Sequence, residues 1–368
     1  MTKKRSRALG LRFRGTPGPR NSLVDVPGIL VGQSQVIGEN ESDGAQIRTG
    51  VTAILPRGFD RTPRPVLAGY YSLNGNGEMT GSHWIRDAGK FLGPICLTNT
   101  HSVGIAHHAA VRWIISHYAG VFEAEHVWAM PVVAETYDGV LNDINGQHVT
   151  EEHVLAAIRG AKSDWADEGN TGGGTGMICY EFKGGTGTSS RRIRIGDKTF
   201  TIGVLVQANH GLRDWLTICG EAVGLQMQED RLIERETGSI IVIIATDLPM
   251  RPDQLSRLAR RAGLGIGRAG TPGGNNSGDI FLALSTANEQ PMPGLGPDFS
   301  QMTHINDDLL DSAYAATVDA TDEAVINAMV AAEDTPTFKP KGRFCRAIDT
   351  ARLVALLRAA GKCDGPMA

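Results

Sequence analysis

The chain alternates between short runs of apolar residues and longer stretches in which apolar positions recur with a helical period. The short runs are rich in Ile, Val and Leu and show little polar alternation, which is typical of strands buried on both faces. They lie at residues 51–55, 66–71, 95–98, 200–208, 240–244 and 280–284. Because strands of this kind must be covered on both faces, the pattern predicts an α/β protein with layered sheets and helices.

The helical stretches lie between and after these runs. Apolar residues recur three and four positions apart at residues 103–118 and 252–268, and helices are also predicted at residues 150–158, 307–332 and 350–360. Two Gly-rich segments, residues 170–176 and 183–190, are predicted to be loops, because Gly is unfavourable inside regular elements. Residues 1–22 are basic and rich in Gly and Pro, and we expect them to form a flexible leader.

Composition excludes several classes of partner for this chain of 368 residues. The formal net charge of −4 does not indicate a nucleic-acid partner. The five Cys are scattered and contain no CxxC pair, so neither a disulfide framework nor a zinc site is predicted, and the His residues show no metal-binding spacing. No stretch has the roughly 18–20 apolar residues of a membrane span. The leader also lacks the apolar run of a signal peptide, so we expect a soluble cytoplasmic protein without metal or cofactor.

The junction between Gly238 and Ser239 directly precedes the apolar run at residues 240–244. One interpretation is a loop that ends in Gly and a strand that opens with a polar residue. The other is a self-cleaving junction, in which the Ser hydroxyl attacks the carbonyl of the preceding residue and water hydrolyses the resulting ester. The new α-amine, with a pKa of roughly 7.7–8.0, would then serve as a base beside the Ser nucleophile.

Other polar residues lie next to predicted strands. Glu135 and Tyr137 follow one strand and Asn209 follows another, and these side chains either form a site or close turns. Ser277 and Asp279 precede the run at residues 280–284, as Ser239 precedes its own. Gly174–Thr175 is a rival junction for self-cleavage, although the sequence after it is a weaker strand.

Several short motifs, each weak alone, occur in an order that is specific when taken together. On these motifs the chain resembles the DmpA-type family of L-aminopeptidase/D-esterases and β-aminopeptidases, from about residue 23 to residue 288. The motifs are Asp25-Val-Pro-Gly28, Gly50-Val-Thr-Ala-Ile-Leu-Pro56, Gly75-Asn-Gly-Glu78, Asn99-Thr-His-Ser-Val-Gly104, Glu135-Thr-Tyr-Asp-Gly139, Gly172-Gly-Gly-Thr-Gly-Met177, Val206-Gln-Ala-Asn-His-Gly211, Gly238-Ser239 and Ser277-Gly-Asp279.

The resemblance implies a four-layer α-β-β-α sandwich, like that of N-terminal nucleophile hydrolases but with different connectivity. It implies a single catalytic domain over residues 23–368 and a cut that leaves a larger piece, residues 1–238, and a smaller piece, residues 239–368. Ser239 is then the nucleophile. Members of the family carry a second Ser and an acidic residue 38 and 40 positions beyond it, where this chain has Ser277 and Asp279.

The remaining roles also come from the resemblance. Tyr137 and Asn209 match the pair that stabilises the oxyanion, and Glu135 matches the carboxylate that holds the free amine of the substrate. The implied activity is a serine-type aminopeptidase acting on small peptides, amides or esters of L-, D- or β-amino acids, assembled as a tetramer of processed heterodimers. Two alternatives are an acyltransferase like the ornithine acetyltransferases, which cut before Thr, and a processed but inactive binding protein.

Overall fold

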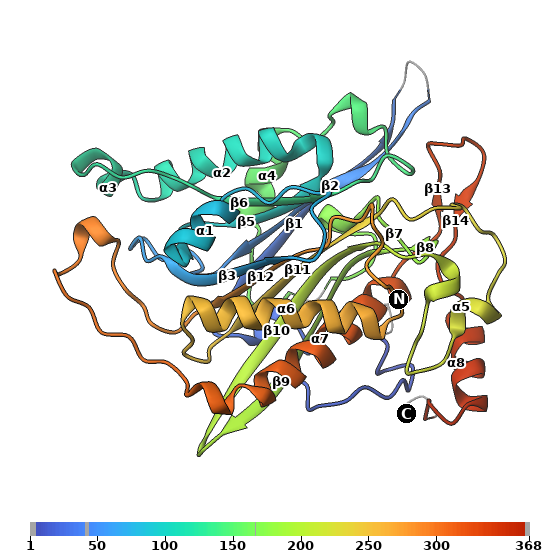
Figure 1. Ribbon diagram of the computed structural model, residues 1–368. Coiled ribbons are helices and arrows are strands. Elements are labelled where there is room, and N and C mark those ends of the chain that lie inside the picture. Colours follow the sequence, from blue (N-terminus) through green and yellow to red (C-terminus); the bar gives the residue numbers. More distant parts are fainter. Residues whose placement is uncertain (1–4, 41–43, 166, 365–368) are drawn as a thin grey trace.

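Two β-sheets lie face to face between two layers of helices (Figure 1). The computed structural model describes residues 5–40, 44–165 and 167–364. One sheet has four strands in the order β1-β2-β5-β6, and the other has six in the order β4-β3-β12-β11-β10-β9. Helices α2 and α4 cover the outer face of the smaller sheet, and α6 and α7 cover that of the larger sheet (Figure 1).

The smaller sheet comprises β1 (Leu30–Glu39), β2 (Gln46–Leu55), β5 (Ile95–Asn99) and β6 (Val132–Thr136). The larger sheet comprises β3 (Val66–Ser72), β4 (Lys90–Phe91), β9 (Gly185–Ile195), β10 (Lys198–Asn209), β11 (Ser239–Thr246) and β12 (Ile280–Ser285). Two short hairpins pair β7 (Ile178–Cys179) with β8 (Phe182–Lys183) and β13 (Thr335–Pro336) with β14 (Phe344–Cys345). The helices are α1 (Ser82–Ala88), α2 (Val103–His117), α3 (Ala119–Ala124), α4 (Glu151–Arg159), α5 (Val223–Gln226), α6 (Pro252–Arg268), α7 (Asp311–Val330) and α8 (Thr350–Ala359).

Strand β11 shows why its apolar run has no polar alternation. Ile241 and Ile243 point into the core between the two sheets, whereas Ile240, Val242 and Ile244 point into the core beneath α6 and α7. Burying one such side chain contributes about 1.5–3 kcal/mol, so both faces stabilise the strand at the centre of the molecule. The predicted α-β-β-α sandwich is therefore confirmed.

Strands β11 and β12 run parallel and are adjacent, and α6 connects them. A parallel pair needs a crossover of this kind, and it brings the two strand beginnings to the same edge of the sheet. Antiparallel pairing with β10 places the end of β10 at that edge as well. The architecture thus gathers the residues before β11 and β12 and after β10.

The prediction of a loop at residues 183–190 is wrong, because β9 begins at Gly185 and pairs with β10 along its whole length. The reason is the close approach of α7. A Cβ at Gly187 would overlap the carbonyl oxygen of Ala324, and Ser189 donates a hydrogen bond to the Ala320 carbonyl at 2.6 Å. Small residues in this strand therefore admit a helix at short distance instead of marking a turn.

The N-terminal segment is also packed more closely than its composition suggests. Arg5 forms an ion pair with Glu168 at 2.7 Å, and Arg7 pairs with buried Glu323 at 2.9 Å. Ser6 lies fully buried between these two arginines. Residues 5–22 are thus held to the domain by their basic side chains, and the rest of the expected flexible leader, residues 1–4, lies outside the described residues. Throughout the described ranges, no helix has the length and apolar character needed to cross a membrane.

Candidate active site

The site lies at the sheet edge where β11 and β12 begin and β10 ends. Ser239 is the first residue of β11 and is paired across the sheet with Asn209, the last residue of β10. Gly238 must be small at this point, because a Cβ there would overlap the carbonyl oxygen of Asn209. The close pairing of the two strands therefore fixes the peptide bond between Gly238 and Ser239 in the wall of the site.

Ser239 contacts the turn that opens β12. Its side chain is almost buried, with an exposed fraction of 6% for the residue, and its Oγ accepts a hydrogen bond from the backbone N–H of Gly278 at 3.0 Å. On either side of Gly278, the Ser277 hydroxyl donates to Oδ1 of Asp279 at 2.5 Å. The structure therefore brings Ser239, Ser277 and Asp279 together, as their matching positions before two strands suggested.

Asp279 is buried, and this burial raises the pKa of its carboxyl group. Three hydrogen bonds oppose the effect of burial, from the Ser277 hydroxyl, the backbone of Ile240 and the side chain of Asn74. The Asn74 amide reaches Oδ2 at 3.3 Å from the Gly-rich segment that follows β3. These donors favour the ionised carboxylate, and an ionised Asp279 increases the ability of the Ser277 oxygen to accept a proton.

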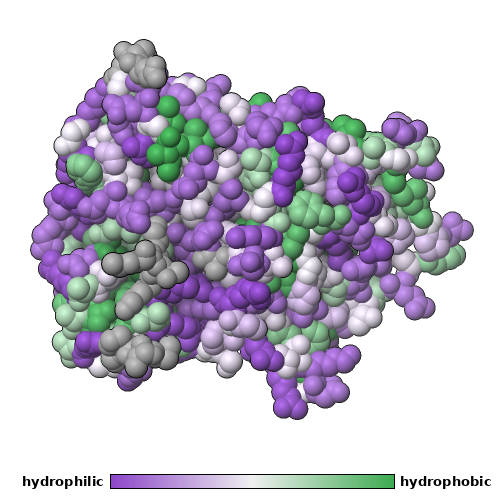
Figure 2. Space-filling view, turned by 180° about the vertical axis from the view of Figure 1, so that it is seen from behind, coloured by the Kyte–Doolittle hydropathy of each residue, from purple (hydrophilic) through white to green (hydrophobic). Residues whose placement is uncertain are grey.

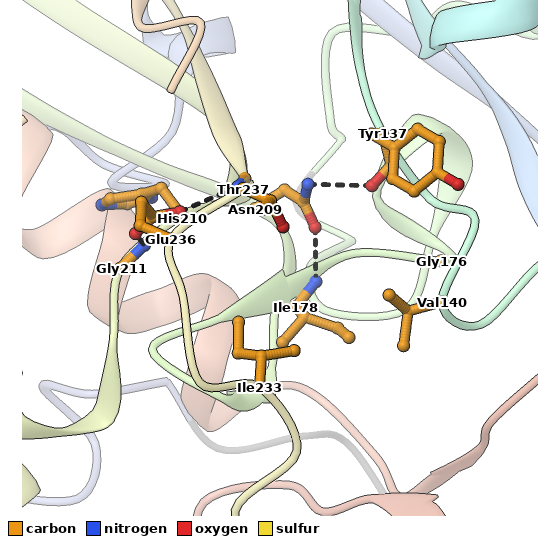
Figure 3. A pocket seen from close by; sticks show the side chains of 11 residues that line it. Tyr137, Val140, Gly176, Ile178, Asn209, His210, Gly211, Ile233, Glu236 and Thr237 are labelled. Atoms are coloured by element: carbon orange, nitrogen blue, oxygen red, sulfur yellow. Dashed lines mark hydrogen bonds between the residues drawn. The ribbon is translucent and has the colours of Figure 1, made fainter. Parts of the chain in front are cut away.

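The Asn209 amide is fixed by two hydrogen bonds, both drawn in Figure 3. Its Oδ1 accepts from the backbone N–H of Ile178 at 2.8 Å, and its Nδ2 donates to the backbone carbonyl of Tyr137 at 2.9 Å. An amide nitrogen carries two N–H groups, so one of them lies beyond this pair of bonds. These two bonds fix the Asn209 side chain on the strand next to Ser239. Its second amide N–H is not used in them.

Tyr137 has a different position from the one expected of an oxyanion donor. Its backbone contacts Asn209, but its hydroxyl points away from the Asn209 amide (Figure 3) and lies against Gly139 in its own turn. The residue as a whole has an exposed fraction of 43%. The structure therefore brings the main chain of Tyr137 into the site, whereas its hydroxyl lies outside.

Glu135 lies near the end of β6 and is almost buried. Its Oε1 accepts from the backbone N–H of Glu78 at 2.8 Å, and its Oε2 accepts from the Thr100 hydroxyl. Burial raises the pKa of Glu135. A Cβ at Gly77 would lie 3.3 Å from Glu135 Oε1 and 3.4 Å from both the Cα of Gly278 and Cδ1 of Ile280, so Gly77 lies between the carboxylate and the turn that Ser239 contacts.

A small cavity of about 20 Å³ lies beside Gly238, with Tyr137, Asn209 and Glu236 also in its lining (Figure 3). Its volume admits about one water molecule. Glu236 accepts hydrogen bonds from the backbone N–H groups of Gly211 and Gly238, the latter at 2.8 Å. The sequence analysis did not identify Glu236 as a site residue. The only feature of the sequence that could have indicated it is the position of a carboxylate two residues before Gly238.

The rival junction at Thr175 has an unsuitable geometry. Thr175 is buried, and its hydroxyl donates to the Gly172 carbonyl at 2.7 Å within a helical turn. The carbonyl of Gly174, which the hydroxyl would have to attack, instead accepts from the Lys183 ammonium at 3.2 Å. Among the residues that the structure describes, no group of His, Cys, Asp or Glu side chains has an arrangement that could hold a metal ion.

Comparisons with known proteins agree with this fold. The chain is 46% identical over 347 residues to the β-peptidyl aminopeptidase BapA of Sphingosinicella microcystinivorans, which covers 89% of this chain and 86% of that protein. The structure of an L-aminopeptidase D-Ala-esterase/amidase from Ochrobactrum anthropi superposes with a TM-score of 0.94 at 54% identity, covering 98% of this chain and 100% of that one. That enzyme is described as a prototype for the serine aminopeptidases and a new variant of the Ntn hydrolase fold.

A β-aminopeptidase from Burkholderia sp. superposes with a TM-score of 0.87 at 43% identity, covering 97% of this chain and 99% of that one. The sequence profile of Peptidase family S58 matches residues 21–342, which is most of the chain. The resemblance inferred from short motifs is therefore confirmed, and the chain belongs to peptidase family S58.

Proposed function

We propose that this protein is a self-processing serine-type aminopeptidase that removes the N-terminal residue from short peptides, amides or esters. The observation that carries the proposal is the position of Ser239. It begins a buried strand directly after a glycine, its Oγ is bonded to Gly278, and the hydrogen-bonded pair of Ser277 and Asp279 flanks that contact. A nucleophile, a proton relay and nearby donors are the components that acyl transfer requires.

The first reaction cuts the chain itself. The Ser239 oxygen attacks the carbonyl carbon of Gly238 and loses its proton, the C–N bond to Ser239 breaks, and that proton passes to the released nitrogen, which becomes a free amine. The resulting ester joins Gly238 to the Ser239 oxygen. Water then hydrolyses this ester, which leaves a carboxylate on Gly238 and returns the hydroxyl to Ser239. The products are residues 1–238 and residues 239–368.

The second reaction acts on substrates. The Ser239 oxygen attacks the substrate carbonyl, while the new α-amine of Ser239 or the pair of Ser277 and Asp279 accepts the hydroxyl proton. The second N–H of the Asn209 amide donates a hydrogen bond to the developing oxyanion. The half-exposed Tyr137 side chain rotates so that its hydroxyl becomes a second donor. The leaving amine takes the proton, and water hydrolyses the acyl-enzyme.

Substrate selection rests on Glu135. A buried carboxylate with a raised pKa gains most from a positively charged partner, and an ammonium group forms a charge-assisted hydrogen bond with it. Gly77 lies between Glu135 and the turn that Ser239 contacts, and it contributes no side chain of its own there. These features support a requirement for a free amine next to the carbonyl that is attacked.

A substrate panel tests the proposed activity. We expect hydrolysis of L-alanyl, D-alanyl or β-alanyl p-nitroanilides with a free amine and no hydrolysis of their N-acetylated forms. Glu135→Gln should weaken binding of free-amine substrates, since a charge-assisted hydrogen bond contributes about 1.5–3 kcal/mol. Equal rates for free and acetylated substrates would contradict the amine anchor and indicate a general amidase or an acyltransferase.

We also propose that the protein assembles as a tetramer of processed heterodimers. Support comes from apolar side chains exposed at one end of the molecule. Trp128 and Phe299 have exposed fractions of 57% and 92%, and they belong to the segments after α3 and after β12 that project on the left in Figure 1. On the face in Figure 2, hydrophobic groups are scattered among hydrophilic ones. Light scattering of the purified protein measures the number of subunits.

We also propose a cytoplasmic location. The support is that all five Cys are unpaired thiols and that four of them are buried. Unpaired thiols are typical of a reducing compartment. Fractionation of cells that express the protein tests this location.

A further inference from the structure

Glu236 lies in the segment that leads to the Gly238–Ser239 bond, and it is buried although its neighbours are not. Its exposed fraction is 8%, whereas Glu234, Arg235 and Thr237 are exposed. A carboxylate is buried only where it finds partners, because the loss of hydration is otherwise unfavourable. The burial of Glu236 therefore indicates a specific set of contacts.

The two oxygens of Glu236 bind backbone groups from two segments. Oε1 accepts from the N–H of Gly238 at 2.8 Å, and Oε2 accepts from the N–H of Gly211, just after β10. Backbone N–H groups bonded to an ionised carboxylate form stronger hydrogen bonds than neutral pairs do. The carboxylate thus bridges the residue before the junction to the end of the neighbouring strand.

The surroundings of this bridge permit little movement. The Gly238 backbone lies against the carbonyl oxygen of Asn209, and a Cβ at Gly274 would lie 2.6 Å from Cγ of Glu236. Glu236 is thus enclosed between the end of β10 and the loop that precedes β12. A side chain confined in this way fixes the orientation of the Gly238 peptide relative to Ser239.

We propose that Glu236 is a positioning residue for self-cleavage, which holds Gly238 so that its carbonyl carbon faces the Ser239 oxygen. This inference rests on the proposed cleavage between Gly238 and Ser239. Glu236 forms and breaks no covalent bond in that step; it acts only through its hydrogen bonds to Gly238 and Gly211. Intramolecular attack depends steeply on alignment, and a misplacement of about 1 Å reduces a rate by about 100-fold.

The rate of cleavage tests this role in full-length chains made by cell-free synthesis with labelled Met. Synthesis is stopped after a short pulse, and the fraction of uncut chain is followed on denaturing gels, with the new terminus identified by mass spectrometry. We expect Glu236→Ala to slow cleavage by about 10- to 100-fold. Glu236→Gln should have an intermediate rate, since its single carbonyl oxygen accepts from one N–H while its NH₂ faces the other. Glu234→Ala, in the same segment but exposed, should match the wild type.

A second comparison separates positioning from folding. The double variant with Glu236→Ala and Ser239→Ala is compared with the Ser239→Ala single variant. Neither chain can cut itself, so their thermal unfolding temperatures report the effect of Glu236→Ala on folding alone. Similar unfolding together with slow cleavage supports positioning. A markedly lower unfolding temperature for the combined variant, with Glu236→Gln as slow as Glu236→Ala, would overturn it.

The outcomes also distinguish this inference from the proposed function. If the wild-type chain is not cut between Gly238 and Ser239, the proposed function itself is wrong. If the wild-type chain is cut there and Glu236→Ala is cut at the same rate, only the role of Glu236 is wrong.

Discussion

Three carboxylates around the site are all nearly buried but have different hydrogen-bond partners. Glu135, Glu236 and Asp279 are all nearly buried, and burial raises the pKa of each. Asp279 bonds a hydroxyl that can relay a proton, Glu236 bonds two backbone N–H groups, and Glu135 bonds one hydroxyl and one N–H. Because the partner determines what each carboxylate can do, their roles are separable by single substitutions.

Ser277→Ala tests the proton relay. We expect kcat to fall by about 10²–10⁴, the usual contribution of general acid–base catalysis, because Asp279 then has no hydroxyl through which to act. The measurement is steady-state hydrolysis of a free-amine p-nitroanilide by fully cut enzyme, with thermal unfolding as the control. A wild-type kcat with only a lower unfolding temperature would show that Ser277 merely caps the turn.

Tyr137→Phe tests whether the half-exposed hydroxyl turns into the site. Loss of one oxyanion donor reduces kcat by about 10²–10³, and this variant removes the hydroxyl while keeping the ring. The comparison uses the same substrate and fully cut enzyme. A kcat within about twofold of wild type would leave oxyanion binding to Asn209 and the backbone.

At the scale of elements, the pairing of β10 with β11 determines which residue can precede Ser239. Gly238→Ala introduces a Cβ that overlaps the carbonyl oxygen of Asn209, so either the junction or the end of β10 must shift. We expect self-cleavage to slow by about 100-fold, as for other small misplacements of reacting atoms. The fraction of uncut chain over time measures this effect.

The matched control for that variant is Gly267→Ala in α6, where a Cβ meets no neighbouring atom. This control should cut at the wild-type rate. Equal cleavage of Gly238→Ala and the control would contradict a requirement for close packing at the junction.

Elements with a regular spacing of apolar residues could be predicted from the sequence. Elements whose residues are determined by contacts with distant segments could not. The predicted helix at residues 252–268 matches α6 in full, because its apolar face and polar face are both regular. Strand β9 was missed, since its Gly and Ser residues are favoured by the nearness of α7 and not by strand propensity. Long-range packing of this kind leaves no local signal in the sequence.

The same distinction applies to the site. Ser239, Ser277 and Asp279 could be placed together, because matching positions before two strands of one crossover predict a shared edge. The orientation of the Tyr137 hydroxyl and the contacts of Glu236 depend on side-chain geometry, which no motif records. Sequence therefore identified most candidate residues, whereas structure was needed to assign their partners.

At the scale of the whole molecule, buried acids make stability depend on pH. Burial raises the pKa of Asp138 to about 7, far above the ordinary value of 3.8 that applies to the unfolded chain. The folded state therefore holds a proton that the unfolded state has lost over the range between these values. Stability from this group is present at low pH and is lost as the pH rises through about 7.

Asp138→Asn tests this dependence. The substitution keeps a neutral side chain at all pH values, so the decrease in unfolding free energy between about pH 5 and about pH 8 should become smaller. One pKa unit corresponds to about 1.4 kcal/mol, so the two units between pH 5 and the folded pKa of about 7 limit the contribution of this carboxyl over the measured range to about 3 kcal/mol. Denaturant unfolding of the uncut Ser239→Ala chain at the two pH values, with and without Asp138→Asn, is the measurement. If the unfolding free energy changed by the same amount between the two pH values with and without Asp138→Asn, the raised pKa of Asp138 would be contradicted.

Mass spectrometry of the purified protein tests the central claim most directly, because self-cleavage and the identity of the nucleophile depend on the same residue. The wild-type protein should contain two polypeptides, residues 1–238 and residues 239–368, formed without added protease. Ser239→Ala should give one uncut chain with no peptidase activity. An uncut but active wild-type protein, a new N-terminus at Thr175, or two polypeptides in the Ser239→Ala variant would contradict the account.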